Sequence, residues 1–439
     1  MTAREAAYAA LSVCRRNGSW SEQALDSVIS KEGLDRRDAS LATRLCMGVL
    51  QNRMLLDWHI GRISSMPFSR IQPQIVDILR IGAYQLLYTE RIPVHAAVNE
   101  SVKLARRYGG SNSAGFVNAL LRRLASERED IPVYSDTDPV KQLSVRYSHP
   151  DWIVREFISQ FGLQQAEQLL AADNMIPGVS LQVNTLVCDT DSAIGSFEAE
   201  GITAERHETV PDCITLSSAG RIAETETYRS GKVFVQDCAA RTAVAVAGPS
   251  QECTVIDACA APGGKSFAAA VYMRNSGRIL SYDIHANKIS KILSGAERLG
   301  ITIIEAGTRD ARDFDPELED KADIVIADVP CSGLGVIRKK PEIRYKDEDQ
   351  LSSLPDIQLD IIKNQSRYVR PGGVMLYSTC TLLRRENEDV ITRFMDSVQG
   401  FVPEDFETCF GSSVGGMLTL LPSVHGTDGF FICKLRRTM

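Results

Sequence analysis

Thr254-Val-Ile-Asp-Ala-Cys-Ala-Ala-Pro-Gly-Gly-Lys265 joins a short apolar strand to a helical pattern through a turn with two adjacent glycines. Such glycines let a ligand approach the backbone closely, and the start of the helix offers free N–H groups. The turn matches neither a Walker loop nor the GxGxxG pattern. Asp283 ends the next strand, about 20 residues beyond the glycines, where a carboxylate can accept hydrogen bonds from ribose hydroxyls. The stretch therefore predicts a pocket for an adenosine-like cofactor.

Strands and helices alternate regularly from about residue 250 to the end of the chain. This alternation is typical of βαβ units, which form a mostly parallel sheet with helices on both faces. We therefore predict a C-terminal α/β, Rossmann-like domain over residues 241–439. The predicted strands are 254–257, 278–283, 301–304, 323–328, 374–378 and 429–434.

The region before this domain divides into three parts. Residues 1–130 show helical periodicity throughout and predict an all-α bundle. Residues 131–175 predict a linker, rich in Pro, Asp and Ser up to residue 150, and then a helix over 152–172. Residues 176–240 predict a small α+β, ferredoxin-like module. Its strands are expected at 180–184, 213–216 and 233–236, with a helix over 191–200, and the helices of the bundle are expected at 4–15, 41–63, 71–88, 96–108 and 115–127.

Composition indicates an ordinary globular protein. The 439 residues are 44% hydrophobic and 24% charged, and we find neither a signal-peptide pattern nor a run of about 18 apolar residues that could span a bilayer. A cytoplasmic protein without a membrane partner is expected. The eleven cysteines lack CxxC and Cys/His metal spacing, so reduced thiols are expected and no metal site. Most of them fit buried small apolar residues: Cys14, Cys46, Cys188, Cys213, Cys238 and Cys409.

The charge is distributed unevenly along the chain. The net charge is −7, but residues 1–130 hold 18 Lys and Arg against 13 Asp and Glu, a net of +5, which leaves −12 for the remainder. A basic head on an acidic body favours polyanion contact through the head, although a solvated helical surface has the same composition. The arginines available for phosphate contact are Arg15, Arg16, Arg36, Arg37, Arg106, Arg107, Arg122 and Arg123.

Two cysteines each follow an apolar run that predicts a buried parallel strand. Cys331 lies in Asp328-Val-Pro-Cys-Ser-Gly333 and Cys380 in Tyr377-Ser-Thr-Cys-Thr381. Reacting groups in an open α/β sheet gather at the carboxyl ends of the strands, so the two thiols are predicted to share one pocket. The alternative is two buried strand-end cysteines without a chemical role.

Two thiols and an acid match the needs of pyrimidine methylation. A pyrimidine becomes nucleophilic at C5 only after a nucleophile adds to C6, and a thiolate can add there and leave again. Addition puts negative charge on the ring, and Asp328, if kept protonated in an apolar pocket, would serve as the acid. A second cysteine would assist release after methyl transfer. The residues alone leave open which cysteine attacks.

These motifs resemble the NOL1/NOP2/Sun family of RNA cytosine-C5 methyltransferases, which use S-adenosylmethionine. The resemblance extends to 231–240, 336–345 and 426–431, while residues 96–110 and 115–123 look like the NusB-type RNA-binding domain. That appendage is typical of the bacterial Fmu/Sun (RsmB) branch, whose enzymes methylate a cytosine of 16S ribosomal RNA. The resemblance implies 16S ribosomal RNA as partner, with no DNA and no obligate protein partner.

The resemblance also assigns roles to single residues. Cys380 becomes the nucleophile and Cys331 the residue that assists release, whereas DNA cytosine methyltransferases, which use the Cys of a Pro-Cys pair, would suggest the reverse. Asp310 takes the third-strand acidic position, one residue off the usual Gly-Asp arrangement. S-adenosylmethionine would be bound by Cys259, Ala260, Ala261, Pro262, Gly263, Gly264, Lys265, Asp283, Asp310 and Asp328.

Two alternative functions remain open at this point. The same chemistry could act on transfer RNA or on another ribosomal site. A binding-class alternative is an RNA chaperone or antitermination factor with a decayed methyltransferase body, against which the intact Cys331, Cys380, Asp328 and Gly263-Gly264 argue.

Overall fold

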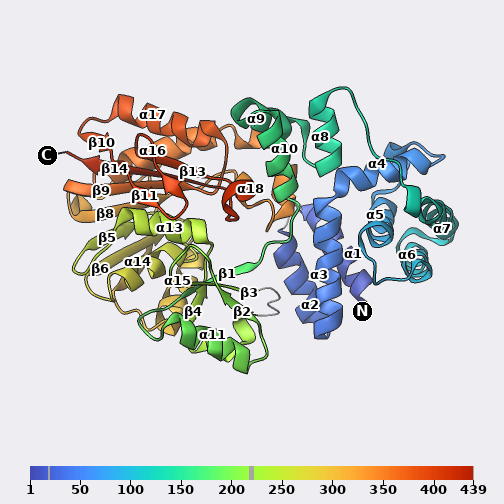
Figure 1. The fold of residues 1–439 in the computed structure, drawn as a ribbon, viewed down its shortest axis with the longest axis horizontal. Coiled ribbons are helices and arrows are strands. Elements are labelled where there is room, and N and C mark those ends of the chain that lie inside the picture. The colour runs from blue at the N-terminus through green and yellow to red at the C-terminus, as the bar shows by residue number, and fades with distance from the viewer. Residues whose placement is uncertain (18–19, 217–221, 439) are drawn as a thin grey trace. The chain divides into compact units, whose positions relative to one another are not determined.

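The computed structural model describes residues 1–17, 20–216 and 222–438 and divides them into two compact units. Unit 1 consists of Met1–Met175 and Ile337–Lys346, and unit 2 of Ile176–Val336 and Asp347–Met439. Figure 1 shows unit 1 as helical and unit 2 as a mixture of strands and helices. A short segment from the C-terminal half of the chain therefore belongs to the N-terminal unit.

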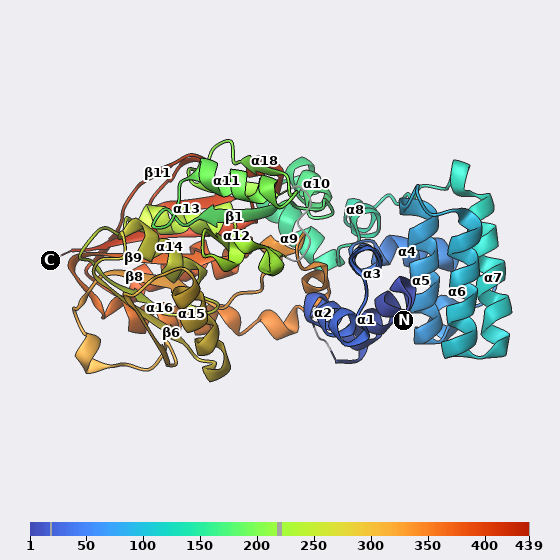
Figure 2. The same cartoon turned by 90° about the horizontal axis from the view of Figure 1, so that it is seen from below.

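Unit 1 is a helical bundle around one apolar core, as predicted. Ile60, Ile78, Leu79 and Leu121, from three different helices, are among its buried residues. Helices α5, α6 and α7 lie side by side in both views (Figures 1 and 2). The helices are α1 (Ala3–Asn17), α2 (Ser21–Glu32), α3 (Arg36–Gln51), α4 (Arg53–Ile63), α5 (Pro73–Tyr88), α6 (Val94–Gly109), α7 (Ser111–Ser126), α8 (Pro139–Tyr147), α9 (Asp151–Phe161) and α10 (Leu163–Ala172).

Three predictions for unit 1 are wrong in detail. The predicted helix 41–63 is two helices, because the chain leaves helical geometry at Asn52 (φ −114°, ψ 18°). The predicted helix 152–172 is interrupted at Gly162, whose φ of 79° favours glycine. The predicted linker contains α8, whose start is marked by Asp138, which accepts a hydrogen bond from Val140 N at 2.9 Å, and by Pro139 at the first helical position. Helix α2 was not predicted.

Unit 2 begins with a small antiparallel sheet in the order β2-β3-β1-β4. Its chain order is strand, helix, two strands, helix, strand, which is the ferredoxin-like arrangement. The short strand β2 was not predicted, and the other three strands lie within one or two residues of the predicted positions. The elements are β1 (Val179–Val183), α11 (Thr190–Ala199), β2 (Ala204–Arg206), β3 (Cys213–Leu216), α12 (Glu226–Arg229) and β4 (Val233–Val235).

An eight-stranded sheet forms the rest of unit 2, in the order β10-β14-β9-β8-β5-β6-β7 with β13 beside β14. Strands β5 to β9 run parallel, and β14 is antiparallel to β9. The third predicted strand was placed too early, because pairing with β6 begins at Ile304. The strands are β5 (Thr254–Asp257), β6 (Arg278–Asp283), β7 (Ile304–Thr308), β8 (Ala322–Asp328), β9 (Val369–Thr379), β10 (Phe401–Pro403), β13 (Met417–Leu420) and β14 (Phe430–Arg437); β11 (Glu407–Thr408) and β12 (Gly411–Ser412) form a separate hairpin.

Helices cover both faces of the large sheet (Figure 1). Alternate residues of β8 show the division: Ile324 and Ile326 enter one apolar core, and Val325 and Ala327 enter the other. The first core holds residues of α13 (Cys238–Ala247), α14 (Gly264–Tyr272) and α15 (Ala286–Arg298), and the second those of α16 (Leu354–Ser366) and α17 (Glu388–Ser397). The last helix is α18 (Pro422–His425).

The order of the strands fixes where a ligand would bind. The chain runs from β5 through β6 to β7 on one side and then returns to place β8 on the other side of β5. A crevice forms at such a switch point, outside the carboxyl ends of the strands. Both the glycine turn and the loop after β8 begin there. Among the described residues, no helix is long and apolar enough to cross a bilayer.

Candidate active site

Cys331 and Cys380 lie next to each other at the carboxyl ends of β8 and β9. These strands are parallel neighbours, and Asp328 pairs with Ser378, so the two loops leave the sheet at the same level. The two sulfur atoms are 3.1 Å apart, and both residues are half-buried free cysteines. The structure thus brings together the two thiols that the sequence predicts in one pocket.

Hydrogen bonds hold the two cysteine loops against each other. Ser332 Oγ and Thr381 Oγ1 are 2.6 Å apart, and Gly335 N donates to Cys380 O at 2.9 Å. Buried Glu386 accepts a hydrogen bond from Ser332 N at 2.9 Å through its carboxylate. The loops are therefore fixed in position by buried polar contacts.

The two thiols differ in their acidity. A hydrogen bond from Cys331 lowers the pKa of Cys380; burial and Asp328 oppose this change, while the ammonium of Lys265 adds to it. The same hydrogen bond, together with burial, raises the pKa of Cys331 well above its usual range. Cys380 is therefore the sulfur that carries a negative charge more readily, and the thiolate is the nucleophilic form.

Lys265 and Asp328 form an ion pair beside the sulfurs. Lys265 Nζ lies 2.6 Å from Asp328 Oδ2, and Ser378 Oγ donates to Asp328 Oδ1 at 2.8 Å. Burial by itself would lower the pKa of Lys265, but the carboxylates of Asp328 and Asp257 outweigh burial and raise it. The ion pair therefore favours the protonated amine of Lys265, which places a cationic proton donor beside the two sulfurs.

The glycine turn has the tight geometry that its sequence predicts. The Ala261–Pro262 peptide bond is cis, and Gly263, with φ of 112°, precedes the first residue of α14. A Cβ on Gly263 would lie 2.4 Å from the ring of Phe267, so a side chain is excluded there. Gly263 N donates to Ala260 O at 2.7 Å, which closes the turn at the start of the helix.

Asp283 lies at the end of β6, facing the glycine turn. Its Oδ2 accepts a hydrogen bond from Ala261 N at 3.3 Å, and its Oδ1 accepts one from His285 N at 2.9 Å. These contacts orient the carboxylate, and each oxygen can still accept a further hydrogen bond. An oriented carboxylate that can accept hydrogen bonds from ribose hydroxyls is compatible with the adenosine part of S-adenosylmethionine.

Two further predicted cofactor residues are Cys259, directly before the glycine turn, and Asp310, after β7. Burial raises the pKa of Cys259, and Asp310 is among the carboxylates that raise it further. Asp310 itself is held by Arg312, whose Nη2 lies 2.6 Å from Asp310 Oδ2, and this hydrogen bond lowers the pKa of the carboxyl group. The structure places Asp310 after β7 with its carboxylate bound by its own loop.

Two polar residues near the site were not predicted. Asp257 ends β5 and is fully buried, and burial raises its pKa to about 6 although Ser266 Oγ donates to Oδ2 at 2.6 Å. Ser378 holds Asp328, as described above. Both could have been predicted from their position at the carboxyl end of a parallel strand beside the switch point.

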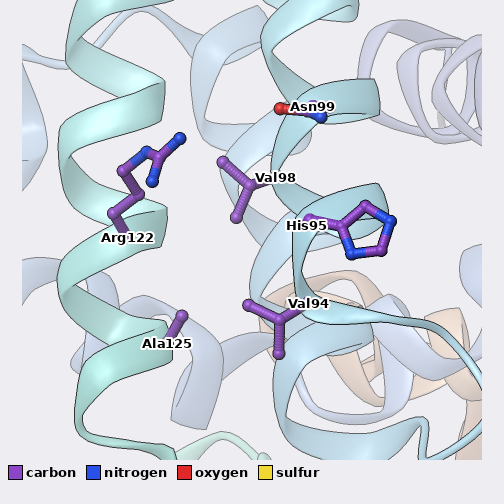
Figure 3. Close-up of a pocket in the computed structure, with 6 residues that line it drawn as sticks. All are labelled: Val94, His95, Val98, Asn99, Arg122 and Ala125. Carbon is purple, nitrogen blue, oxygen red and sulfur yellow. The ribbon is translucent and has the colours of Figure 1, made fainter.

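The predicted phosphate-contact arginines are all exposed in unit 1. Some of them have protein partners: Arg15 pairs with Asp77 at 2.8 Å, and Arg107 pairs with Glu5. Arg122 lines a cavity of about 420 Å³ between α6 and α7, where it and Ala125 face Val94 and Val98 (Figure 3). A second cavity, of about 450 Å³, is lined by Arg44, Tyr88, Glu90 and Arg91. Both cavities are in the helical unit.

Three family models match successive parts of the chain. The model described as NusB family matches residues 1–126, a model described as an RsmF/B-like, ferredoxin-like domain matches residues 149–223, and the model described as 16S rRNA methyltransferase RsmB/F matches residues 244–436. They confirm the predicted NusB-like, ferredoxin-like and Rossmann-like methyltransferase folds.

Relatives and solved structures agree over nearly the whole length. The chain is 37% identical over 443 residues to the probable ribosomal RNA small subunit methyltransferase B of Bacillus subtilis (strain 168), covering 99% of this chain and 98% of that protein. It is 32% identical to the protein of the same name from Synechocystis sp., covering 100% of both. The crystal structure of PH0851 matches with a TM-score of 0.84 at 24% identity, over 99% of this chain and 98% of that one. NSun6 from Pyrococcus horikoshii, solved with SFG, matches with a TM-score of 0.59 at 21% identity, over 66% of this chain and 98% of that one.

Proposed function

The chain belongs to the RsmB/F family of 16S rRNA methyltransferases, and on this basis we propose that it methylates C5 of one cytosine in 16S ribosomal RNA through a covalent adduct between Cys380 and C6. As a member of that family it is an S-adenosylmethionine-dependent methyltransferase of small-subunit ribosomal RNA. The cytosine chemistry and the roles of single residues are the proposal.

The observation that carries the proposal is the pair of sulfur atoms 3.1 Å apart beside the Lys265–Asp328 ion pair. Most methyl acceptors are nucleophilic enough without a protein thiol, whereas C5 of a pyrimidine is not. Of the two thiols, Cys380 has the lowered pKa, so it can supply the thiolate that must add to C6 before C5 becomes nucleophilic. The asymmetry supports Cys380 rather than Cys331 as the nucleophile.

The first step is the attack of the Cys380 thiolate on C6. A bond forms between sulfur and C6, and the electron pair of the C5–C6 double bond moves into the ring, toward C5 and N3. The protonated amine of Lys265 beside Asp328 can stabilise this charge or donate a proton to the ring. The base must leave its stack first, because neither carbon can be reached inside a helix.

S-adenosylmethionine, when bound, supplies an electrophilic methyl group to C5. The glycine turn 259–265 would hold it at the start of α14, and Asp283 would accept hydrogen bonds from its ribose hydroxyls. We also assign Asp328 and Asp310 to the binding of S-adenosylmethionine.

Release then restores the aromatic ring. A proton leaves C5 to a base, the C5–C6 double bond forms again, and the bond between C6 and Cys380 breaks with its electron pair returning to the sulfur. The Cys331 thiol, 3.1 Å away, stabilises the departing thiolate by a hydrogen bond. The contact that lowers the pKa of Cys380 in the free protein is thus the one that assists release.

We assign contact with folded RNA to exposed arginines of the helical unit. Arg36 and Arg37 are exposed at the start of α3, and adjacent arginines of this kind bind phosphates. Replacing both with glutamine is expected to weaken RNA binding and to reduce the slope of log K against log salt by about 2. An unchanged slope would exclude these two residues as phosphate contacts.

The decisive experiment maps 5-methylcytosine in ribosomal RNA from cells with and without the gene. Loss of one 16S site, restored by the wild-type chain and not by Cys380→Ala, is the expected result. Loss of a modification in transfer RNA instead would contradict the assignment of 16S ribosomal RNA as the substrate. Loss of a methyl group from another base or another atom would contradict methylation at C5 of cytosine.

A further inference from the structure

Glu386 is a fully buried carboxylate next to the sulfur pair, and the steps of methyl transfer give it no chemical role. It ends the short 3₁₀ helix Arg384–Glu386 and follows Cys380 by six residues in the loop after β9. Its Oε2 accepts hydrogen bonds from Ser332 N and from Gln358 Nε2, both at 2.9 Å. Both donors are neutral, and among the described residues Oε1 has no hydrogen-bond partner. Burying a carboxylate with so few donors is costly, so a functional reason for its position is expected.

Gln358 and Glu386 together hold the peptide groups on both sides of Cys331. Gln358 Nε2, from α16, donates to Pro330 O at 2.9 Å, while Glu386 accepts from Ser332 N. The hydrogen bond between the two side chains joins these contacts into one clamp. The carboxylate therefore has a fixed place beside the Cys331 loop, and every residue of the clamp belongs to unit 2.

The residue after Glu386 holds the other cysteine in the same way. Asn387 is buried, and its Oδ1 accepts a hydrogen bond from Thr379 Oγ1 at 2.6 Å. Its Nδ2 donates to Thr381 O at 3.1 Å, so Asn387 binds both neighbours of Cys380. Two consecutive residues thus fix the two thiols relative to one buried carboxylate.

This carboxylate makes the two sulfurs electrically unequal. A negative charge disfavours a second one nearby in a buried site. The hydrogen bond with Cys380 and burial raise the pKa of Cys331, and Glu386 raises it further. Asp328 acts on both sulfurs and so separates them less. The charged groups that act on Cys380 from other elements are Lys265, Asp328 and Asp428.

We propose that Glu386 is a positioning residue whose carboxylate keeps the one proton of the cysteine pair on the Cys331 sulfur, so that the negative charge stays on Cys380. The inference deepens the proposed function and rests on it for the roles of the two cysteines. Glu386 acts through the thiols and not on RNA or cofactor. Cys331 thereby keeps the proton with which it can donate a hydrogen bond to the departing sulfur.

The test measures which sulfur carries the charge, in the full-length protein without RNA. Iodoacetamide alkylates a thiolate with loss of iodide, so the ratio of label on Cys380 to label on Cys331 after brief treatment follows the distribution of the charge. The two forms with one proton differ only in where that proton lies, so their ratio does not depend on pH. Glu386→Gln keeps the length of the side chain and an acceptor oxygen but removes the charge. It is expected to lower the ratio by about 10-fold, which corresponds to one pKa unit.

Two further variants separate charge from packing. Glu388→Gln is the matched control, because it removes the same charge two residues further along, where the carboxylate acts on Cys433. It should leave the ratio unchanged. Glu386→Asp keeps the charge on a shorter side chain and should retain most of the preference for Cys380. A purely structural role predicts the opposite order, since Gln preserves the shape of Glu386 and Asp does not.

A second readout connects the charge to the reaction. Attack on C6 uses the same thiolate that iodoacetamide labels. With RNA and S-adenosylmethionine, the rate of adduct formation in a single turnover of Glu386→Gln should therefore fall by the same factor as the rate of alkylation of Cys380. Affinity for S-adenosylmethionine should stay unchanged. An adduct rate that does not follow the alkylation rate would contradict the proposal.

The outcomes separate this proposal from the proposed function. A folded Glu386→Gln protein with the wild-type labelling ratio, changed only in melting temperature, would overturn the role of the charge. If that variant does not fold, Gln358→Lys places an ammonium against the same carboxylate, and an unchanged ratio there overturns it instead. Because labelling needs neither RNA nor methyl transfer, its failure leaves the proposed function intact, whereas absence of 5-methylcytosine from wild-type reactions would contradict the function alone.

Discussion

Two pairs of cysteines in unit 2 have the same separation and opposite surroundings. Cys331 and Cys380 lie at the ends of parallel strands with sulfurs 3.1 Å apart, and Cys213 and Cys238 have their sulfurs 3.1 Å apart as well. The first pair is half-buried beside an ion pair, and the second is fully buried in a small apolar cluster with Val210.

The difference between the pairs lies in what acts on each sulfur. Cys380 receives a hydrogen bond and the field of the Lys265 ammonium, which lower its pKa. For Cys238 the hydrogen bond with Cys213, burial and the carboxylate of Asp237 all raise the pKa. Proximity of two thiols therefore does not make a reactive site; the hydrogen bonds and charges around each sulfur decide which of them carries the negative charge.

The largest expected effect comes from removing the proposed nucleophile. Cys380→Ala should lower methyl transfer by about 10⁴-fold or more, because no covalent adduct can form. Affinity for S-adenosylmethionine, measured by calorimetry, should stay unchanged. The matched change in the other pair, Cys238→Ala, should leave the rate within about twofold. Near-normal turnover of Cys380→Ala would remove the distinction between the pairs.

Cys331→Ala should slow turnover by about 100-fold, since it removes the group that stabilises the leaving thiolate. Because attack is still possible, we expect adduct to accumulate as a slower band on a denaturing gel. Cys213→Ala supplies the control and should give no such band. A turnover defect in Cys331→Ala without any adduct would exclude the release role.

The third prediction concerns the pH dependence of thiol reactivity. The thiolate is the deprotonated form, so a lowered pKa gives Cys380 a reactive thiolate at lower pH than an ordinary cysteine. Lys265→Met removes a cation that lowers this pKa and should shift the alkylation profile of Cys380 to higher pH. Peptide mapping after iodoacetamide treatment measures the shift, with Cys238 as the internal reference that should not respond. An unshifted profile would show that Lys265 does not tune the nucleophile.

The smallest effect is on stability. Cys238→Ala removes a buried sulfur and should lower the free energy of unfolding by about 1–2 kcal/mol, which urea denaturation can measure. Cys380→Ala is expected to lower the free energy of unfolding by less, because Cys380 is only half-buried and burial disfavours its charged form. A larger loss for Cys380→Ala would mean that its role is structural.

The sequence predicted the elements of the catalytic domain better than the contacts between them. Apolar runs ending at Asp328 and Ser378 located β8 and β9 and placed both cysteines at the carboxyl ends. Periodicity does not encode which strands are neighbours or in what register they pair. The 3.1 Å separation of the Cys331 and Cys380 sulfurs and the Lys265–Asp328 ion pair therefore could not be predicted. The equally close Cys213–Cys238 pair was missed for the same reason.

The helical unit shows a different limit. Helix periodicity located most of the bundle, but Asn52 and Gly162 interrupt helices whose apolar pattern continues across them. The sequence could not predict the hydrogen bonds that buried Arg344 donates to Gln51 O and Asn174 Oδ1, because these acceptors lie 293 and 170 positions away along the chain. The roles of single site residues and the domain boundaries at 130, 175 and 240 remain predictions.

The measurement that tests the central claim most directly is peptide mapping of the covalent protein–RNA adduct formed by Cys331→Ala with 16S ribosomal RNA and S-adenosylmethionine. We predict that the RNA-derived mass is attached to the peptide that contains Cys380, as a methylated cytidine. Attachment to any other cysteine, or an adduct that forms equally well when Cys380 is replaced by alanine, would contradict the assignment of Cys380 as the nucleophile.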